Sequence, residues 1–290
     1  MSKSKNFSRV IAGTMTWGSW GKQLSKLEMV QLMNACVEMG LTTFDHADIY
    51  GNYENESDFG AAFVESGISR GDVQLISKCG IQMTQGRKNQ VKHYQYDADY
   101  IIWSAEQSLQ KLRTDYLDLF LLHRPSPLIH PDEVGKAIES LKKDGKIKQF
   151  GVSNFSPSQV ALLDASVKVE GNQVEYALTH VSPMYDGTFD DCIINDRLAM
   201  AWSPLGTFFR QEGEQKNRIS KVVKELSKKY HADESQLLLA FILKHPVGIH
   251  PVVGTTNKDR LNASLKATAI QLEVQDWFLL LEASVGNEVP

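Results

Sequence analysis

Four polar residues have the chemical types needed to protonate a carbonyl oxygen: Asp45, Tyr50, Lys78 and His123. A phenol has a reference pKa of about 10, so it donates a proton near neutral pH only with help. The ammonium of Lys78 would stabilise the phenolate of Tyr50 and lower its pKa, and Asp45 would keep the lysine charged and oriented. A neutral His123 could hydrogen-bond the substrate oxygen. Together the four side chains would suit proton transfer to a substrate oxygen, with Tyr50 as the acid.

Each of these residues, taken alone, also has an ordinary structural interpretation. An Asp after a strand often caps a turn, a Lys that ends a strand is usually solvated, and a buried His often satisfies backbone groups. We favour the chemical interpretation because all four would lie at the C-terminal ends of three successive strands. His46 and Asp48 stand beside Asp45, but D-H-A-D is not a recognised ligand spacing. We therefore predict no metal ligands and assign His46 to packing or to support of its neighbours.

The composition is that of an ordinary globular protein. The 290 residues are 42% hydrophobic and 23% charged, with a formal net charge of -4. Because no run of basic residues is present, we expect neither nucleic acid nor a membrane as a partner. The longest apolar run, residues 237–243, is much shorter than the roughly 20 residues that span a bilayer. We expect a monomer or a weak homo-oligomer.

The cysteines are far apart in the sequence and form no C-x-x-C pair; they are Cys36, Cys79 and Cys192. This spacing favours free thiols in a reducing compartment over a disulfide framework or a zinc site. No apolar signal core follows the N-terminal residues. We therefore expect a cytoplasmic location.

Short apolar runs alternate with helical patterns along the whole chain. The runs that predict strands are residues 7–16, 42–44, 73–77, 117–122, 147–152, 172–175, 198–202 and 248–253. Strict alternation of this kind predicts a parallel sheet, and eight strands predict a closed (β/α)8 TIM barrel. We expect one domain over residues 1–290, with the active site at the C-terminal ends of the strands. A doubly wound sheet is disfavoured because no strand is followed by G-x-G-x-x-G.

Cap signals and apolar spacing define the helices between these strands. Ser25 and Glu28 match a capping box, and the helix that they begin should stop at Gly40. Further helices are expected over residues 54–66, 100–113, 131–143, 218–230 and 235–244, from 156 and 257 onward, and over 274–283 outside the barrel. Residues 80–98 are too long for an ordinary connection and predict a substrate loop; residues 207–217 predict a second lid.

Several motifs in order resemble those of one family. They are D-H-A-D-I-Y-G from 45, Lys78, L-L-H-R-P from 121, G-V-S-N-F from 151, Q-V-E-Y from 173, S-P-L-G from 203 and V-G-T-T from 253. Over nearly its whole length the chain resembles the aldo-keto reductases, most of all bacterial oxidoreductases of that family. The resemblance implies NADPH-dependent reduction of aldehydes and ketones to alcohols, with Asp45, Tyr50, Lys78 and His123 as a catalytic tetrad.

The resemblance also implies a cofactor site for NADP(H). It assigns Ser153, Asn154 and Gln173 to the carboxamide, Trp202 to the face of the nicotinamide ring, Ser203, Leu205 and Gly206 to the pyrophosphate, and Gly254, Thr255, Thr256 and Arg260 to the 2′-phosphate. Lys258 adds positive charge nearby, so we expect NADPH to be preferred over NADH. As alternatives to these cofactor roles, Trp202 could simply pack in the core and Arg260 could lie on a surface helix. This chain has Ala263 and Ser264 where many members hold adenine with Glu and Asn.

Aromatic and basic side chains near the predicted mouth suggest an apolar or aromatic carbonyl substrate; they are Trp17, Trp20, Tyr53, His93, Tyr94, Tyr96, Phe208 and Phe209. Because a fold does not fix a function, two alternatives remain. The first is an NADP(H)-binding regulatory module with little turnover, like the potassium-channel β subunits. The second is a metal-dependent hydrolase that would use Asp45, His46 and His123.

Overall fold

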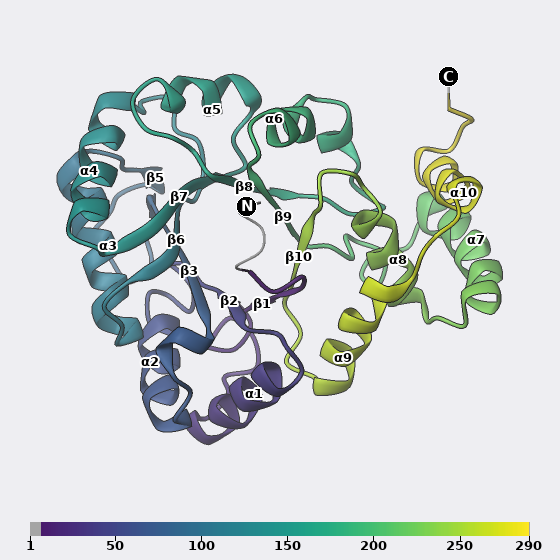
Figure 1. Cartoon of the computed structure of the whole chain (residues 1–290), viewed down its shortest axis with the longest axis horizontal. Helices are drawn as coiled ribbons and strands as arrows, with labels where there is room; N and C mark the ends of the chain where they lie inside the picture. The colour runs from purple at the N-terminus through teal and green to yellow at the C-terminus, as the bar shows by residue number, and fades with distance from the viewer. Residues whose placement is uncertain (1–6, 290) are drawn as a thin grey trace.

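The computed structural model describes residues 7–289, and within that range eight parallel strands close into a barrel (Figure 1). Around the barrel they run in the order β1-β10-β9-β8-β7-β6-β3-β2. Their bounds are β1 (Ile11–Gly13), β2 (Thr43–Asp45), β3 (Gln74–Cys79), β6 (Leu117–Leu122), β7 (Ile147–Ser153), β8 (Gly171–Glu175), β9 (Leu198–Trp202) and β10 (His250–Val253). The predicted (β/α)8 barrel is confirmed, and its parallel strands present their C-terminal ends at one face.

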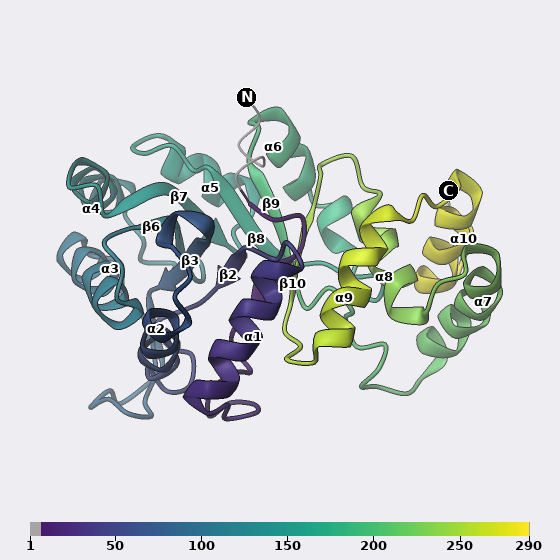
Figure 2. The same cartoon turned by 60° about the horizontal axis from the view of Figure 1, so that its bottom comes forward.

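Helices surround this barrel, and one pair lies beyond it. The bounds are α1 (Lys26–Glu38), α2 (Asn55–Ser66), α3 (Ala98–Leu112), α4 (Pro131–Lys143), α5 (Pro157–Asp164), α6 (Thr188–Ile194), α7 (Glu214–Tyr230), α8 (Glu234–Leu243), α9 (Lys258–Lys266) and α10 (Val274–Val285). Short 3-10 helices occupy Arg70–Asp72, Ser182–Met184 and Ala267–Ala269. Figure 2 shows α10 packed with α7 at the side of the molecule, so the helix predicted outside the barrel is present there.

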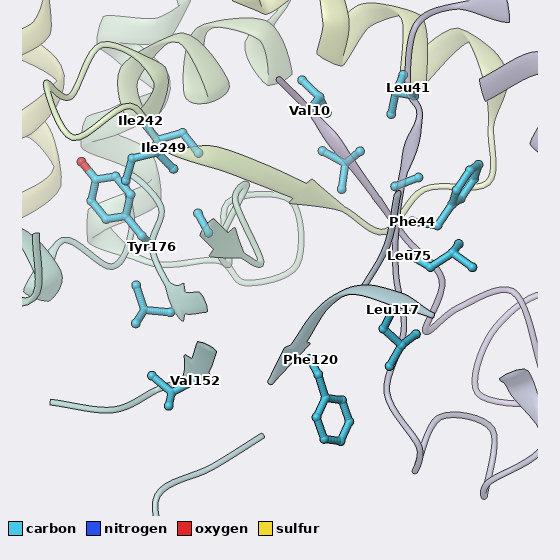
Figure 3. Close-up of a cluster of buried hydrophobic side chains, with 14 of the residues drawn as sticks. Val10, Leu41, Phe44, Leu75, Leu117, Phe120, Val152, Tyr176, Ile242 and Ile249 are labelled. Atoms are coloured by element: carbon cyan, nitrogen blue, oxygen red, sulfur yellow. The ribbon is translucent and has the colours of Figure 1, made fainter. Parts of the chain in front are cut away.

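Apolar side chains fill both sides of the strands, as expected of parallel strands that are covered on both faces. Between strands and helices lies the larger cluster, which includes Phe44, Phe120 and Tyr176 (Figure 3). A smaller cluster of Phe7, Ile11, Ile76, Leu119, Leu121, Leu198, Met200 and Val252 is separate from it. Full burial of a large apolar side chain stabilises the fold by about 1.5–3 kcal/mol. This packed scaffold gives the polar residues at the strand ends a rigid support.

The predicted start and end of α1 are confirmed in detail. The hydroxyl of Ser25 accepts a hydrogen bond from the backbone N–H of Glu28, and the Glu28 side chain accepts one from the backbone of Ser25. These bonds satisfy N–H groups that have no partner inside the helix. Gly40 follows the helix with φ of +84°, a left-handed conformation that favours glycine.

Several predicted boundaries differ from the observed ones. The first strand was expected over residues 7–16 but pairs only over Ile11–Gly13, and β3 runs on to Cys79, so Lys78 lies inside a strand. The loop 80–98 contains a small antiparallel sheet, β4 (Ile81–Gln82) with β5 (His93–Tyr94). The second predicted lid is shorter than expected because α7 begins at Glu214. Helix α6, seven residues long, was not predicted.

Other features of the described chain bear on the sequence-based expectations. All three cysteines are buried free thiols. Within residues 7–289, no helix is long and apolar enough to cross a membrane.

A cavity of about 200 Å³ opens at the N-terminal ends of the strands and is lined by Phe7, Gly71, Val73, Gln74, Tyr116, Asp118, Lys148 and Gln149. It lies at the end of the barrel opposite to the residues predicted to act in chemistry.

Candidate active site

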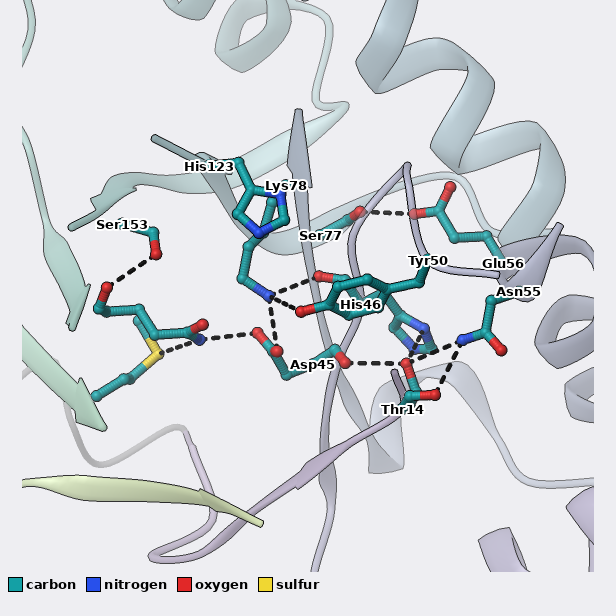
Figure 4. A network of polar contacts seen from close by, with 12 residues as sticks. Thr14, Asp45, His46, Tyr50, Asn55, Glu56, Ser77, Lys78, His123 and Ser153 are labelled. Carbon is teal, nitrogen blue, oxygen red and sulfur yellow. Dashed lines mark hydrogen bonds and ion pairs between the residues drawn. The ribbon is translucent and has the colours of Figure 1, made fainter. Parts of the chain in front are cut away.

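Asp45 and Lys78 form a buried ion pair at the C-terminal face of the barrel (Figure 4). Asp45 ends β2, Lys78 lies near the end of the adjacent strand β3, and Lys78 Nζ is 2.6 Å from Asp45 Oδ2. The two residues are only 2% and 1% exposed. Because removing one partner would leave an uncompensated buried charge, the pair holds the two strand ends in a fixed relationship.

The ammonium of Lys78 donates to three acceptors. These are Asp45 Oδ2 at 2.6 Å, the backbone oxygen of His46 at 2.8 Å and Tyr50 Oη at 3.3 Å. A lysine ammonium has three N–H donors, so none remains free. Tyr50 Oη therefore accepts from Lys78, which leaves its own hydrogen to donate elsewhere.

The pKa values of Lys78 and Tyr50 are set by burial and by each other. Burial lowers the pKa of Lys78, but the charge of Asp45 and the contact with Tyr50 more than offset this effect and raise it. For Tyr50, burial raises the pKa more than Lys78 lowers it. The expectation of a lowered pKa for Tyr50 was therefore wrong in its net direction, because desolvation outweighs the neighbouring ammonium. The phenol keeps its proton at neutral pH, as a proton donor must.

His123 follows β6 and faces the tyrosine. Its backbone N–H donates to the carbonyl of Cys79 at 2.9 Å, and its ring centroid lies 6.1 Å from that of Tyr50 at an interplanar angle of 79°. Burial and the charges of Lys78, Arg124 and Lys92 hold the pKa of His123 well below its usual value. The imidazole is therefore neutral, which agrees with the prediction made for it.

His46 supports the end of β2, and its Nε2 is buried without a hydrogen-bond partner among residues 7–289. Thr14 Oγ1 donates to the carbonyl of Asp45 at 2.9 Å, so it accepts from His46 Nδ1, also at 2.9 Å. This assignment puts the ring hydrogen of His46 on Nδ1. Burial and Lys78 lower the pKa of His46 to about 3, and its ring packs against Phe59 at 4.2 Å. Its role is packing and support, as the sequence suggested.

A continuous chain of hydrogen bonds joins the residues predicted to hold nicotinamide to Asp45. Gln173 Nε2 donates to Asp45 Oδ1 at 2.9 Å, and Ser153 Oγ donates to the carbonyl of Gln173 at 2.8 Å. Asn154 Nδ2 donates to Ser153 Oγ at 2.8 Å, and Trp202 Nε1 donates to Asn154 Oδ1 at 2.8 Å. The chain crosses β7, β8 and β9, so the ring of Trp202 is oriented relative to Asp45.

The segment predicted to meet pyrophosphate turns sharply after β9. Ser203 has φ of +51° and Gly206 has φ of +55°. A Cβ at Gly206 would lie 1.9 Å from Thr179 Oγ1, so no larger residue fits this turn. Arg210 donates to Ser203 Oγ at 3.2 Å and to the carbonyl of Gly206 at 2.8 Å. Leu205 packs against the core.

The segment after β10 presents unpaired positive charge. The side chains of Lys258 and Arg260 make no hydrogen bond or ion pair with any residue of the described range 7–289. Both lie in the first turn of α9, whose N-cap Asn257 accepts from the backbone of Arg260. Gly254 is exposed, and a Cβ placed there would meet nothing within 4 Å.

The remaining residues of this segment support the same end of the site. Thr255 Oγ1 accepts from the backbone of Asn257 at 3.2 Å, and Thr256 is half-buried beside it. Ser264 Oγ donates to the carbonyl of Arg260 at 2.8 Å, so its hydroxyl is used inside α9. Ala263 has no polar side-chain atom to offer.

Comparison with known proteins identifies the family of the chain. The sequence model described as "Aldo/keto reductase family" matches residues 9–283. The chain belongs to the aldo/keto reductase family. It is 37% identical to the oxidoreductase YdhF of Escherichia coli, over 98% of this chain and 96% of that protein. It is 34% identical to a 6-dehydroglucose reductase of Agrobacterium fabrum, over 100% of this chain and 98% of that protein.

A solved structure also shares the fold of this aldo/keto reductase. The thermostable aldo-keto reductase Tm1743, described in complex with the inhibitor epalrestat, superposes with a TM-score of 0.82. The two chains are 26% identical, with 98% of each covered. The barrel and its catalytic face are therefore those of a family of oxidoreductases.

The aromatic residues expected at the mouth of this aldo/keto reductase divide into two groups. Trp20 is 37% exposed with its ring 6.2 Å from that of Tyr50, and Phe209 is 51% exposed. Trp17 is 1% exposed and packs against Phe44 and Phe59, so its prediction as a substrate residue was wrong. Three further members of that set are also buried; they are Tyr53, Tyr96 and Phe208. Tyr94 is half-buried and His93 is exposed.

Two arginines near the site were not singled out from the sequence. Arg210 contacts the turn after β9, and Arg124 directly follows His123. The only sequence signal was their position after motif residues, and a cation in a loop is usually solvated.

Proposed function

We propose that this protein is an NADPH-dependent reductase that converts aldehydes and ketones to alcohols. The observation that carries the proposal is the contact of Lys78 Nζ with both Asp45 and Tyr50, at one end of the hydrogen-bond chain that leads to Trp202. It combines a proton donor, a cation that orients it and a flat aromatic ring at one barrel face.

The residues at this face fit NADP(H). Gln173 Oε1 accepts no hydrogen bond from residues 7–289, so it is free to accept from a carboxamide N–H. The half-buried indole of Trp202 offers a flat surface to a nicotinamide ring. The open space at Gly254 and the unpaired side chains of Lys258 and Arg260 suit a phosphate dianion at the adenosine end.

The proposed roles of the chain's own residues follow from their contacts. NADPH, when bound, supplies the hydride. Tyr50 donates the proton to the carbonyl oxygen, since its raised pKa keeps it protonated and Lys78 holds its oxygen in place. Lys78 stabilises the phenolate that remains, and Asp45 balances the charge of Lys78. The neutral imidazole of His123 orients the carbonyl oxygen by a hydrogen bond.

Two measurements test this proposal. Fluorescence titration should show tighter binding of NADPH than of NADH. Arg260→Ala should weaken the binding of NADPH but not that of NADH. Turnover should then be measured on benzaldehydes, simple ketones and sugar aldehydes, which are included because a relative is named 6-dehydroglucose reductase. Tyr50→Phe should lower kcat by roughly 10²- to 10⁴-fold with NADPH affinity retained.

The control is Tyr185→Phe, which removes a hydroxyl from an exposed tyrosine. If Tyr50→Phe reduces aldehydes as fast as the parent does, the assignment of the acid is wrong. Tight binding of NADPH without turnover of any carbonyl compound would instead favour the regulatory module.

A further inference from the structure

Arg124 is held in a fixed place beside the catalytic face. It directly follows His123, and its backbone is anchored by the buried side chain of Tyr96. Tyr96 Oη donates to the carbonyl of Arg124 at 2.5 Å and accepts from its backbone N–H at 3.2 Å. These two bonds fix the backbone of Arg124, and so the point from which its side chain extends.

The guanidinium of Arg124 lies at the mouth of the site. Its Cζ is 5.4 Å from the centroid of the Trp202 ring. Its positive charge adds to the lowering of the pKa of His123 by burial and opposes in part the raising of the pKa of Tyr50 by burial. Arg124 is therefore within electrostatic reach of the proposed acid and of the imidazole.

This guanidinium has no counter-charge in the described chain. Arg124 is half-buried, yet its side chain makes no hydrogen bond and no ion pair with residues 7–289. The half-buried Arg70, by contrast, pairs with Asp118 and donates to backbone oxygens. The carboxylate of Asp45 is already occupied by Lys78 and Gln173. The guanidinium of Arg124 contacts the ring of Trp202, and a cation–π contact does not neutralise the charge, so we look for its counter-ion in a ligand.

The 2′-phosphate at the adenosine end of the cofactor is not suited to be that partner. The segments that fit the phosphates of the cofactor follow β9 and β10, at Ser203–Gly206 and at Lys258 and Arg260. Arg124 follows β6, and three strands, β7, β8 and β9, separate β6 from β10 on one side of the barrel. Figure 1 shows β6 and β10 on opposite sides of the ring. Arg124 therefore lies far from Lys258 and Arg260, and its charge is close to Trp202, Tyr50 and His123, where the carbonyl substrate would react.

We propose that Arg124 selects substrates that carry a carboxylate in addition to the reducible carbonyl. A guanidinium binds a carboxylate through two parallel N–H···O bonds, which would fix the carbonyl relative to Tyr50 and His123. The inference rests on the proposed function and narrows it from apolar or aromatic carbonyl compounds to aldehydo and keto acids. Lys92, exposed on the loop 80–98, adds positive charge that favours the approach of an anion.

The test compares matched acid and amide substrates with NADPH. The pairs are 4-formylbenzoate with 4-formylbenzamide, and 3-formylbenzoate with 3-formylbenzamide. In the parent, kcat/KM for the acid should exceed that for the amide by about 10- to 100-fold, the range of a charge-assisted hydrogen bond. Arg124→Gln should reduce this ratio to below about 3, mainly through KM of the acid. Arg113→Gln, at an exposed position, is the matched control and should keep the parental ratio.

Three outcomes would overturn the inference. They are equal kcat/KM for acid and amide in the parent, a ratio that survives Arg124→Gln, and an equal loss for both substrates accompanied by weaker NADPH binding. The last would make Arg124 a cofactor residue.

If the parent reduces no substrate, the proposed function has failed but the inference is still tested by binding. Benzoate should then bind more tightly than benzamide in a tryptophan-fluorescence titration, and Arg124→Gln should remove the difference; equal binding overturns it.

Discussion

Gln173 Nε2 donates a 2.9 Å hydrogen bond to Asp45 Oδ1, although the residues are 128 positions apart in the sequence. The other oxygen of the same carboxylate accepts from Lys78 Nζ. One aspartate thus connects the amide groups that lead to Trp202 with the ammonium that contacts Tyr50. A movement of Gln173, on the proposed cofactor side, would therefore disturb Asp45 and with it the position of Lys78 beside Tyr50.

Replacement of Gln173 by Leu should affect both sides. The loss of a hydrogen bond to a charged group should lower the free energy of unfolding by about 1.5–3 kcal/mol. It should also weaken NADPH binding, because the amide that fits the carboxamide is removed. Urea unfolding and a fluorescence titration measure the two effects. Gln149→Leu, the same change at the opposite end of the barrel, should leave NADPH affinity unchanged. Parental affinity in Gln173→Leu would refute the proposed contact.

The ion pair of Asp45 and Lys78 should show strong energetic coupling. Asp45→Asn and Lys78→Met should each lower the free energy of unfolding by about 3–5 kcal/mol, because each leaves a buried group without its partner. The double variant should lose clearly less than the sum of the two single losses. Urea unfolding of the four proteins gives the coupling energy. Additive losses would mean that the two charges do not compensate each other.

The rate of reduction should depend little on pH between 6 and 9. The pKa of Tyr50 is raised above its usual 10, so the phenol holds its proton throughout this range. The pKa of His123 lies well below 6.5, so the imidazole stays neutral. A profile of kcat against pH with saturating substrates checks both directions. A fall in kcat centred near pH 7 would show that one of these groups titrates there.

Asp48 should make the fold less stable as pH rises. Burial, followed by the charge of Glu56, raises the pKa of Asp48 from 3.8 to about 8. The folded chain then holds a proton that the unfolded chain releases above about pH 4. The stability that depends on this proton is fully present below pH 4 and is lost between pH 4 and pH 8.

The neutral variant Asp48→Asn should escape this loss. In urea unfolding its advantage over the parent should grow from pH 5 to pH 8, by roughly 1.4 kcal/mol per pH unit at most. Asp115→Asn, at an exposed carboxylate, should follow the parent at every pH. A constant difference between Asp48→Asn and the parent would show that Asp48 is ionised in the folded protein.

Most of the barrel could be predicted because its elements are long enough to show a pattern. The bounds of β6, α4 and β9 agree with the expected ones, since an apolar run or a Pro at the first helical turn marks each of them. The sheet of β4 and β5 could not be predicted, because strands of two residues show no alternation. Helix α6 is too short for helical periodicity to be recognised.

The positions of the site residues were easier to predict than their surroundings. The strand-end rule placed Asp45, Lys78 and His123 at one face, and the structure brings them together there. The pKa of Tyr50 could not be predicted, because it depends on a balance between burial and one ammonium. The burial of Trp17 was missed because an aromatic residue beside a glycine looks the same in sequence whether it faces solvent or the core.

The short strand β1 closes the barrel by pairing with the last strand, β10, as well as with β2. It lies between β10 and β2, and near it the ring of His250 hydrogen-bonds the carbonyl of Ser8 at 2.9 Å. During synthesis the ring of strands thus stays open until β10, the last of its strands, has left the ribosome, and loop-closure entropy opposes this step. We expect a nascent chain that ends before His250 to expose an unpaired sheet edge, to associate with other chains and to bind no NADPH. Sedimentation and fluorescence titration of such a truncated protein would detect both effects.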